Sequence, residues 1–114
     1  MNKKLNTRSL LMIENIYNGF CRFPKYDVEC VDYQMDDADA KCIDVYLQGK
    51  FCNRYLFYPN PDGSINSICL YGMLLQQHCQ KISASMNCFG LKVTKIFYDD
   101  KGLNPFLDIY IAQY

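Results

Sequence analysis

The sequence predicts an α+β fold, a two-layer sandwich with two helices on one face of a mainly antiparallel five-stranded sheet, in the order α-β-β-β-α-β-β. Three observations support this prediction. Apolar residues recur at three- and four-residue steps in two segments, 7–20 and 64–86. They alternate with polar residues in others, most clearly 41–48 and 106–114. Short turns connect the alternating segments, so neighbouring strands should be antiparallel.

Length and composition narrow the class of protein. With 114 residues we expect one domain, 1–114. A chain of this size buries about two-thirds of its unfolded surface. Half of the residues (50%) are apolar, which argues against disorder. The formal net charge is zero, so the sequence does not predict a general electrostatic attraction to nucleic acid.

The first predicted helix runs from Thr7 to about Phe20. Thr7 is a candidate N-cap because its hydroxyl can accept a hydrogen bond from an amide of the first turn. Gly19 and Pro24 bracket the end of this helix. The spacing predicts one apolar stripe, with Ile16 beside it: Leu10, Ile13, Tyr17 and Phe20.

The second predicted helix spans Ser64 to Met86 and is expected to be the centre of the fold. The preceding turn residues, 60–63, stop a strand, and Ser64 is a candidate N-cap. The first half of this helix is apolar nearly all round, so it should be the most buried part of the protein. The expected core face is Ile65, Ile68, Gly72, Leu75, Cys79, Ile82 and Met86.

The five predicted strands are 26–35, 41–48, 51–58, 91–98 and 106–114, with loops at 36–40 and 99–102. Between the second and third strands we expect a three-residue hairpin loop. This register pairs Leu47 with Phe51, Asp44 with Arg54, and Ile43 with Tyr55. Opposite charges and large apolar side chains are then matched. If the last strand lies at a sheet edge, its unpaired amides allow a homodimer.

The chain contains seven cysteines: Cys21, Cys30, Cys42, Cys52, Cys69, Cys79 and Cys88. Their number is odd, the first residues lack the pattern of a secretion signal, and no stretch approaches transmembrane length. We therefore expect a cytoplasmic protein that does not bind membranes and whose thiols stay reduced. Each cysteine is expected to be a small buried hydrophobe.

No pattern in the sequence predicts a catalytic, metal or cofactor site. There is no C-x-x-C pair, and the single histidine, His78, is the immediate neighbour of Cys79, which is a poor arrangement for two metal ligands. No carboxylate lies one turn from His78 to orient it as a catalytic base. The acidic loop that begins at Asp36 lacks the Gly and Glu of a calcium-binding EF-hand. We expect no cofactor, no metal and, although the sequence leaves the point open, no enzyme activity.

Charge is distributed unevenly along the chain. Between Asp27 and Asp44 lie seven acidic residues against Lys41 alone, so this segment has a net charge of −6. One interpretation is a solvated loop beside an edge strand that its charge protects from aggregation. It also predicts a surface that binds a basic partner, formed by Asp27, Glu29, Asp32, Tyr33, Asp36, Asp37, Asp39, Asp44 and Tyr46.

These features predict a small non-catalytic binding protein that neutralises a basic partner protein. A toxin-immunity protein directed against a nuclease toxin, or an inhibitor from a mobile element, has the required properties, because it must complement a positively charged cleft. The alternative is a small-molecule binding domain with a pocket between sheet and helix. That pocket would be lined by tyrosines: Tyr46, Tyr55, Tyr58, Tyr71, Tyr98 and Tyr110.

Overall fold

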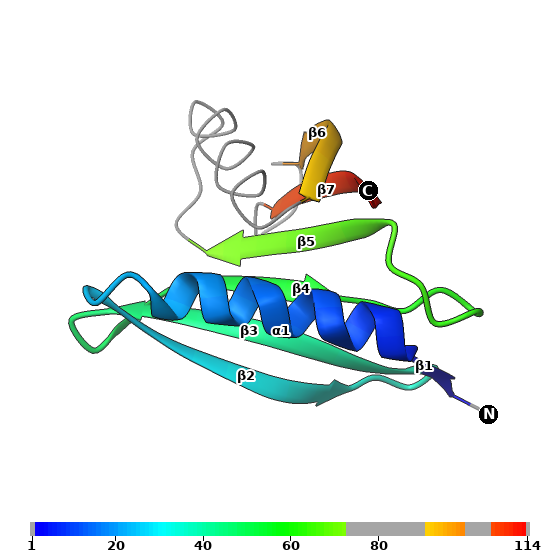
Figure 1. The fold of residues 1–114 in the computed structure, drawn as a ribbon, viewed down its shortest axis with the longest axis horizontal. Helices are drawn as coiled ribbons and strands as arrows, with labels where there is room; N and C mark the ends of the chain where they lie inside the picture. Colours follow the sequence, from blue (N-terminus) through cyan, green and yellow to red (C-terminus); the bar gives the residue numbers. More distant parts are fainter. Residues whose placement is uncertain (1, 73–90, 100–105, 114) are drawn as a thin grey trace.

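The computed structural model describes residues 2–72, 91–99 and 106–113. In these ranges the protein is α+β, with one helix and a seven-stranded, mostly antiparallel sheet (Figure 1). The elements in chain order are β1 (Lys3–Lys4), α1 (Thr7–Cys21), β2 (Tyr26–Gln34), β3 (Ala38–Leu47), β4 (Lys50–Phe57), β5 (Ser67–Gly72), β6 (Leu91–Asp99) and β7 (Phe106–Gln113).

The sheet follows the order β1-β3-β4-β5-β7-β6, and β2 pairs with β3. Among the described strands, only the two-residue β1 is parallel to its neighbour, β3. Helix α1 lies along β3 and β4 on one face of the sheet, while β6 and β7 are steeply inclined to those strands (Figure 1). The sheet therefore curves between β3–β4 and β6–β7.

Helix α1 begins at Thr7, as predicted, but its N-cap is Asn6 and not Thr7. The Asn6 side-chain oxygen accepts a hydrogen bond from the Ser9 amide at 2.8 Å. The carbonyl of Gly63 accepts bonds from the Asn6 amide at 3.0 Å and the Ser9 hydroxyl at 2.7 Å. These bonds connect the start of α1 to the turn after β4 and satisfy amides that a helix end leaves unpaired.

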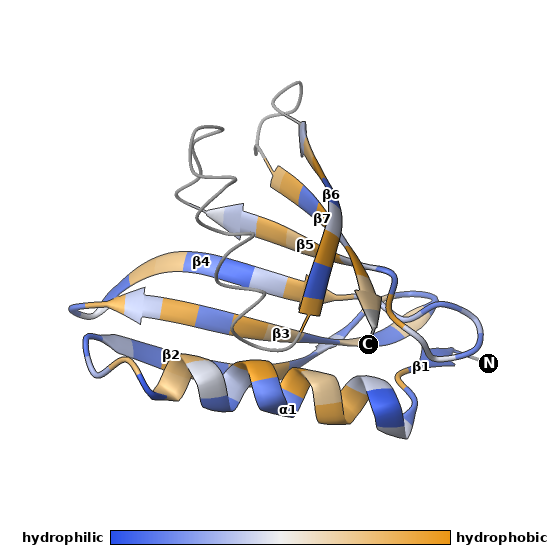
Figure 2. Cartoon of the chain, turned by 45° about the horizontal axis from the view of Figure 1, so that its top comes forward, coloured by the Kyte–Doolittle hydropathy of each residue, from blue (hydrophilic) through white to orange (hydrophobic). Residues whose placement is uncertain are grey.

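The buried stripe of α1 is rotated from the predicted one. Met12, Ile13, Ile16 and Phe20 are buried, whereas Leu10 keeps 40% of its surface exposed. Tyr17 is only partly buried against the core. Colouring by hydropathy shows apolar and polar residues alternating around the helix (Figure 2). The error has a physical reason: several adjacent apolar residues at 10–13 permit more than one 3.6-residue stripe.

The hairpin of β3 and β4 confirms part of the predicted register. Asp44 is opposite Arg54 and Ile43 is opposite Tyr55, as expected. The register shifts between Val45 and Tyr46, so that Leu47 is opposite Lys50 and not Phe51. The turn residues Gln48 and Gly49 both have positive φ (52° and 76°), which suits a two-residue hairpin turn. A bulge near the turn, which no periodicity predicts, accounts for the wrong loop length.

The predicted helix at 64–86 is wrong over its first part, because Ser67–Gly72 is the strand β5. Ile68 and Leu70 are buried on one side, while Cys69 and Tyr71 alternate with them on the other. A short, fully apolar run does not distinguish a buried helix from a strand by period alone. The rest of the predicted helix, 73–86, lies outside the described residues.

Gly72 ends β5 in a backbone conformation with φ of 117°. It lies opposite Asn53, and a Cβ atom placed on it would collide with the carbonyl oxygen of Cys52. Only glycine tolerates both the conformation and the close approach of β4. This requirement, and not a helix interface, explains the glycine at this position.

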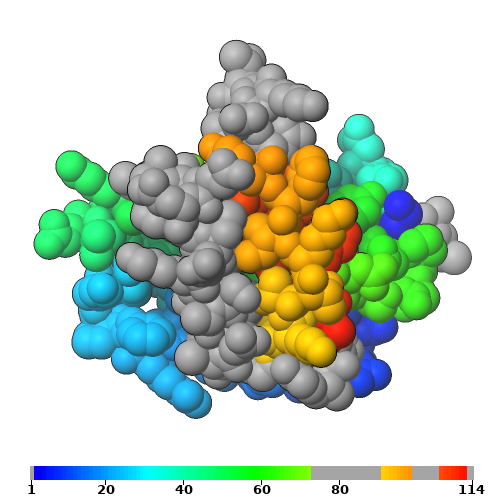
Figure 3. All heavy atoms as spheres, turned by 90° about the horizontal axis from the view of Figure 1, so that it is seen from above, coloured from blue at the N-terminus to red at the C-terminus, as the bar shows by residue number. Residues whose placement is uncertain are grey.

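All five predicted strands are present in the described ranges, with altered ends. Strand β3 starts at Ala38, inside the predicted loop 36–40, because Ala38 and Asp39 pair with β1. The last strand, β7, is not an edge as the homodimer expectation assumed, because it pairs with both β5 and β6. Strand β6 ends the strand order and covers part of the surface seen from above (Figure 3).

Candidate functional site

The two faces of the sheet carry different side chains. The face toward α1 contains the hydrophobic core, including Ile43, Phe57, Ile68 and Ile109. We call the opposite one the outer face and define it by Glu29, Tyr33, Cys42, Asp44, Arg54 and Tyr71. Its central residues are directly opposite one another across four strands, from Glu29 on β2 through Asp44 and Arg54 to Tyr71 on β5. One row of side chains therefore crosses the sheet.

An ion pair lies in the middle of this row. Arg54 Nε donates to Asp44 Oδ1 at 2.7 Å, and its Nη2 donates to Asp44 Oδ2 at 3.0 Å. The Asp44 side chain is only 5% exposed, against 37% for Arg54. The hydrogen bonds that Arg54 donates to Asp44 raise the pKa of the Arg54 guanidinium, so Arg54 remains a cation. Among the described residues, Arg54 Nη1 makes no further hydrogen bond.

Glu29 has an unfavourable position in the free protein. It is exposed on β2 and directly opposite Asp44, so two carboxylates face each other across the β2–β3 ladder. Like charges in such a pair destabilise a sheet. Arg54 is on the far side of Asp44 and already forms a two-point ion pair with it. Glu29 has no ion-pair partner in the described part of the chain.

Asp27, two residues earlier on the same face of β2, is also exposed and unpaired among the described residues. It lies opposite Tyr46, whose ring makes an edge contact with Phe51 at a centroid distance of 5.9 Å. Phe51 is 46% exposed. Two carboxylates without ion-pair partners in the described ranges and the exposed ring of Phe51 thus share one end of the outer face, an arrangement typical of protein interfaces.

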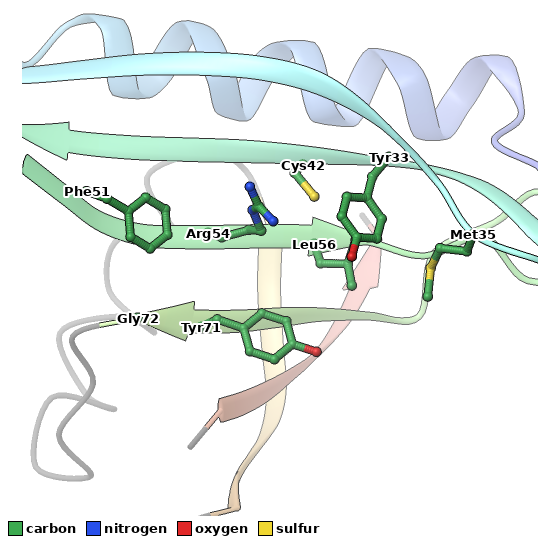
Figure 4. Close-up of a pocket in the computed structure, with 8 residues that line it drawn as sticks. All are labelled: Tyr33, Met35, Cys42, Phe51, Arg54, Leu56, Tyr71 and Gly72. Atoms are coloured by element: carbon green, nitrogen blue, oxygen red, sulfur yellow. The ribbon is translucent and has the colours of Figure 1, made fainter. Parts of the chain in front are cut away.

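A hollow of about 550 Å³ lies on the outer face (Figure 4). Figure 4 shows Arg54 in the centre of its floor, between Phe51 and Leu56, with Tyr71 on the adjacent strand β5 and Tyr33 on β2. Arg54 Cζ is 5.6 Å from the centroid of the Tyr33 ring. The described lining is Tyr33, Met35, Cys42, Phe51, Arg54, Leu56, Tyr71 and Gly72.

The predicted acidic surface is divided between the two faces and the β2–β3 loop. Asp32 and Asp39 lie on the same side as α1, where Lys41 Nζ is 2.9 Å from Asp32 and the Asn2 amide donates to Asp39. The hydrogen bond to Asp32 raises the pKa of Lys41. The net charge counted along segment 27–44 leaves out two cations from elsewhere in the chain that pair with its carboxylates, Arg54 and Lys3.

Asp37, in the β2–β3 loop, has partners from two other parts of the chain. The Tyr58 hydroxyl donates to its Oδ2 at 2.7 Å, and Lys3 Nζ lies 3.4 Å from the same oxygen. The bond from Tyr58 lowers the pKa of Asp37, and Lys3 adds to the effect. Asp37 therefore fixes the loop to β1 and the end of β4. Its neighbour Asp36 is exposed and unpaired in the described chain.

The tyrosines expected to line a pocket between helix and sheet do not converge. Tyr55 belongs to the core, where its ring centroid is 5.1 Å from that of Phe20, and Tyr98 packs against the same core. Burial raises the pKa of Tyr55 to about 12. Tyr71 lines the outer-face hollow, and Tyr46 and Tyr110 share that face. Tyr58 bonds to Asp37 and Lys3.

The five described cysteines are free thiols in different environments. Cys42 is buried, whereas Cys21 and Cys30 are exposed, so the expectation that each cysteine is a buried hydrophobe is wrong for those two. Burial raises the pKa of both Cys42 and Cys69 to about 11. Cys79 and Cys88 lie outside the described residues.

In the described ranges, no group of three or more His, Cys, Asp or Glu side chains is placed to hold a metal ion. No helix there has both the length and the apolar character needed to cross a membrane. Comparisons of this chain with protein-family models, curated proteins and solved structures found no match.

Proposed function

We propose that this chain is a non-catalytic binding protein that docks a basic partner protein along β2 and the adjoining outer face. A toxin-immunity protein or another inhibitor of a basic protein is the kind of molecule that we infer. The observation that carries this proposal is the Glu29–Asp44 pair, in which two carboxylates lie opposite each other and Arg54 forms an ion pair with Asp44 alone among the described residues. A Lys or Arg of a partner placed beside Glu29 would relieve that repulsion.

The surroundings of Glu29 support the same proposal. Asp27 extends the negative charge along β2, and Tyr33 (40% exposed) and Phe51 (46% exposed) provide apolar contact area. Aromatic residues provide much of the binding energy at interfaces, while charges steer the approach of the partner. Asp32, Asp37 and Asp44 have cationic partners of their own and contribute less to this steering.

The test uses the protein as bait for proteins of its source cell at low salt. Wild type should recover a basic protein, and Asp27→Asn/Glu29→Gln should recover much less of it. The matched control is Asp32→Asn, which removes a carboxylate from the other face and should recover as much as wild type. Equal recovery by all three baits, or no basic protein at all, contradicts the proposal.

The hollow favours a second candidate function, the binding of a small molecule. Its volume of about 550 Å³ falls among those of ligand sites, which run from about 300 to 1,000 Å³. At its floor, Arg54 Nη1 has N–H donors that no described residue accepts from. A thermal-shift screen with a metabolite library discriminates the two functions. Under this candidate, Tyr71→Ala abolishes the ligand's shift, while Asp27→Asn/Glu29→Gln retains it.

A further inference from the structure

Strand β2 is an edge of the sheet in the described part of the chain. Its nine residues pair with β3 along one side only. At about 3.3 Å per residue, it presents an edge of about 30 Å. In Figure 1, β2 lies at the rim of the sheet, below α1. Every second residue of β2 thus directs its backbone N–H and C=O away from the sheet, and such groups are a template for another strand.

The charges on β2 determine which strand can pair with it. Asp27, Glu29 and Asp32 occupy three of its nine positions, and the strand contains no cation. Two copies of β2 side by side would bring six carboxylates into one ladder, which disfavours self-association. A strand with Lys or Arg opposite Asp27 and Glu29 would form favourable cross-strand pairs instead.

We propose that the basic partner docks by strand addition, placing an extended segment against the free edge of β2. This inference rests on the proposed function and adds the mode of recognition. On the outer face, the segment has two basic residues two positions apart, opposite Asp27 and Glu29. The next two residues on that face are apolar, opposite Val31 and Tyr33. Main-chain bonds hold the segment, and the side chains select it.

The probe is a synthetic nine-residue peptide with this pattern. At alternate positions it carries two valines followed by two lysines, and threonine occupies the positions between them. The control peptide replaces the intervening threonines with proline, which keeps both lysines but removes backbone N–H donors. We expect the first peptide to bind at least about tenfold more tightly than the control, and to slow hydrogen exchange of alternate β2 amides.

Two chain variants sharpen the test. Asp27→Asn/Glu29→Gln should weaken binding of the first peptide about tenfold or more at low salt, whereas Asp32→Asn, on the other face, should change it less than about twofold. Equal binding of the two peptides means that charge alone attracts them, and overturns strand addition. Protection of amides outside β2, or no binding of the first peptide up to about 1 mM, overturns it as well.

Failure of this inference is distinguishable from failure of the proposed function. If the bait experiment recovers a basic partner that depends on Asp27 and Glu29, but β2 amides exchange freely in that complex, strand addition is wrong and the proposed function stands. If no basic partner depends on these carboxylates, the proposed function fails, whatever the peptides do.

Discussion

Two phenylalanines on β4 illustrate the difference between the faces of the sheet. Phe57, on the side of α1, is completely buried, whereas Phe51, on the outer face, leaves 46% of its surface exposed. The contrast is reversed for the ion pairs, because Asp44 on the outer face is 5% exposed, whereas Asp32 on the α1 side is 79% exposed. Apolar side chains thus stabilise the inner face, while the outer face combines a buried charge with exposed rings. If the outer face binds the proposed partner, folding and recognition depend on different residues of the same strands.

The largest expected effect concerns the two phenylalanines. Phe57→Ala should lower the free energy of unfolding by about 3–5 kcal/mol, because it removes a buried ring and leaves a cavity. Phe51→Ala should cost less than about 1 kcal/mol, since much of its ring is already in water. Urea denaturation measures both. Similar losses at the two positions would mean that the outer face is part of the core.

The two ion pairs should differ in the opposite direction, with the larger loss of stability on the outer face. Arg54→Met keeps most of the apolar stem but leaves the Asp44 carboxylate buried without its counter-ion, and we expect a loss of about 3 kcal/mol. The matched variant Lys41→Met leaves Asp32 in water and should cost less than about 1 kcal/mol. Denaturation curves at neutral pH compare them. A larger loss of stability for Lys41→Met than for Arg54→Met would mean that Lys41–Asp32, and not Arg54–Asp44, is the pair that stabilises the fold.

The thiols distinguish the floor of the outer face from the exposed surface. Because burial raises the pKa of Cys42 and Cys69 to about 11, only about one thiol in a thousand is ionised at pH 8 in each. Both should react slowly with iodoacetamide, whereas exposed Cys21 reacts fast. Mass spectrometry of peptides after timed labelling gives the three rates. Raising the pH toward 11 should accelerate the labelling of Cys42 and Cys69, if the protein stays folded. Fast labelling of Cys42 at pH 8 would contradict its burial.

The smallest expected effect is on the stability of the free protein when Glu29 loses its charge. Glu29→Gln should leave the free energy of unfolding unchanged or raise it by up to about 0.5 kcal/mol, because it removes repulsion with Asp44. A thermal or urea unfolding comparison with wild type tests this. A clear loss of stability would show that Glu29 has a stabilising partner, and that it serves folding.

Much of the fold is predictable from periodicity. Alternation of apolar and polar residues predicts the strands at 41–48 and 106–114, and the structure confirms both, with ends that differ by a few residues. Matched charges predict the Asp44–Arg54 pairing, which is also confirmed. Periodicity failed at Ser67–Gly72, because a run with apolar residues on both faces has no two-residue period. It also missed β1, since a two-residue strand has no measurable period.

The candidate site is harder to predict from the sequence than the fold is. The acidic segment is a feature of the chain, but its partners Lys3 and Arg54 come from outside it, and only the register places them. The alternation of β2 was the signal that could have separated Asp27 and Glu29 from Asp32, because odd and even residues lie on opposite faces. The hollow around Arg54 combines side chains of four strands, and no local pattern encodes it.

The central claim is that Asp27 and Glu29 are present for recognition. The most direct measurement is the association rate of the recovered basic partner with wild type, Asp27→Asn/Glu29→Gln and Asp32→Asn, as a function of salt. The account predicts that the double variant associates markedly more slowly at low salt. The difference should shrink as salt screens charges over about 8 Å at physiological ionic strength, with Asp32→Asn close to wild type throughout. Identical association rates for all three proteins at low salt would contradict it.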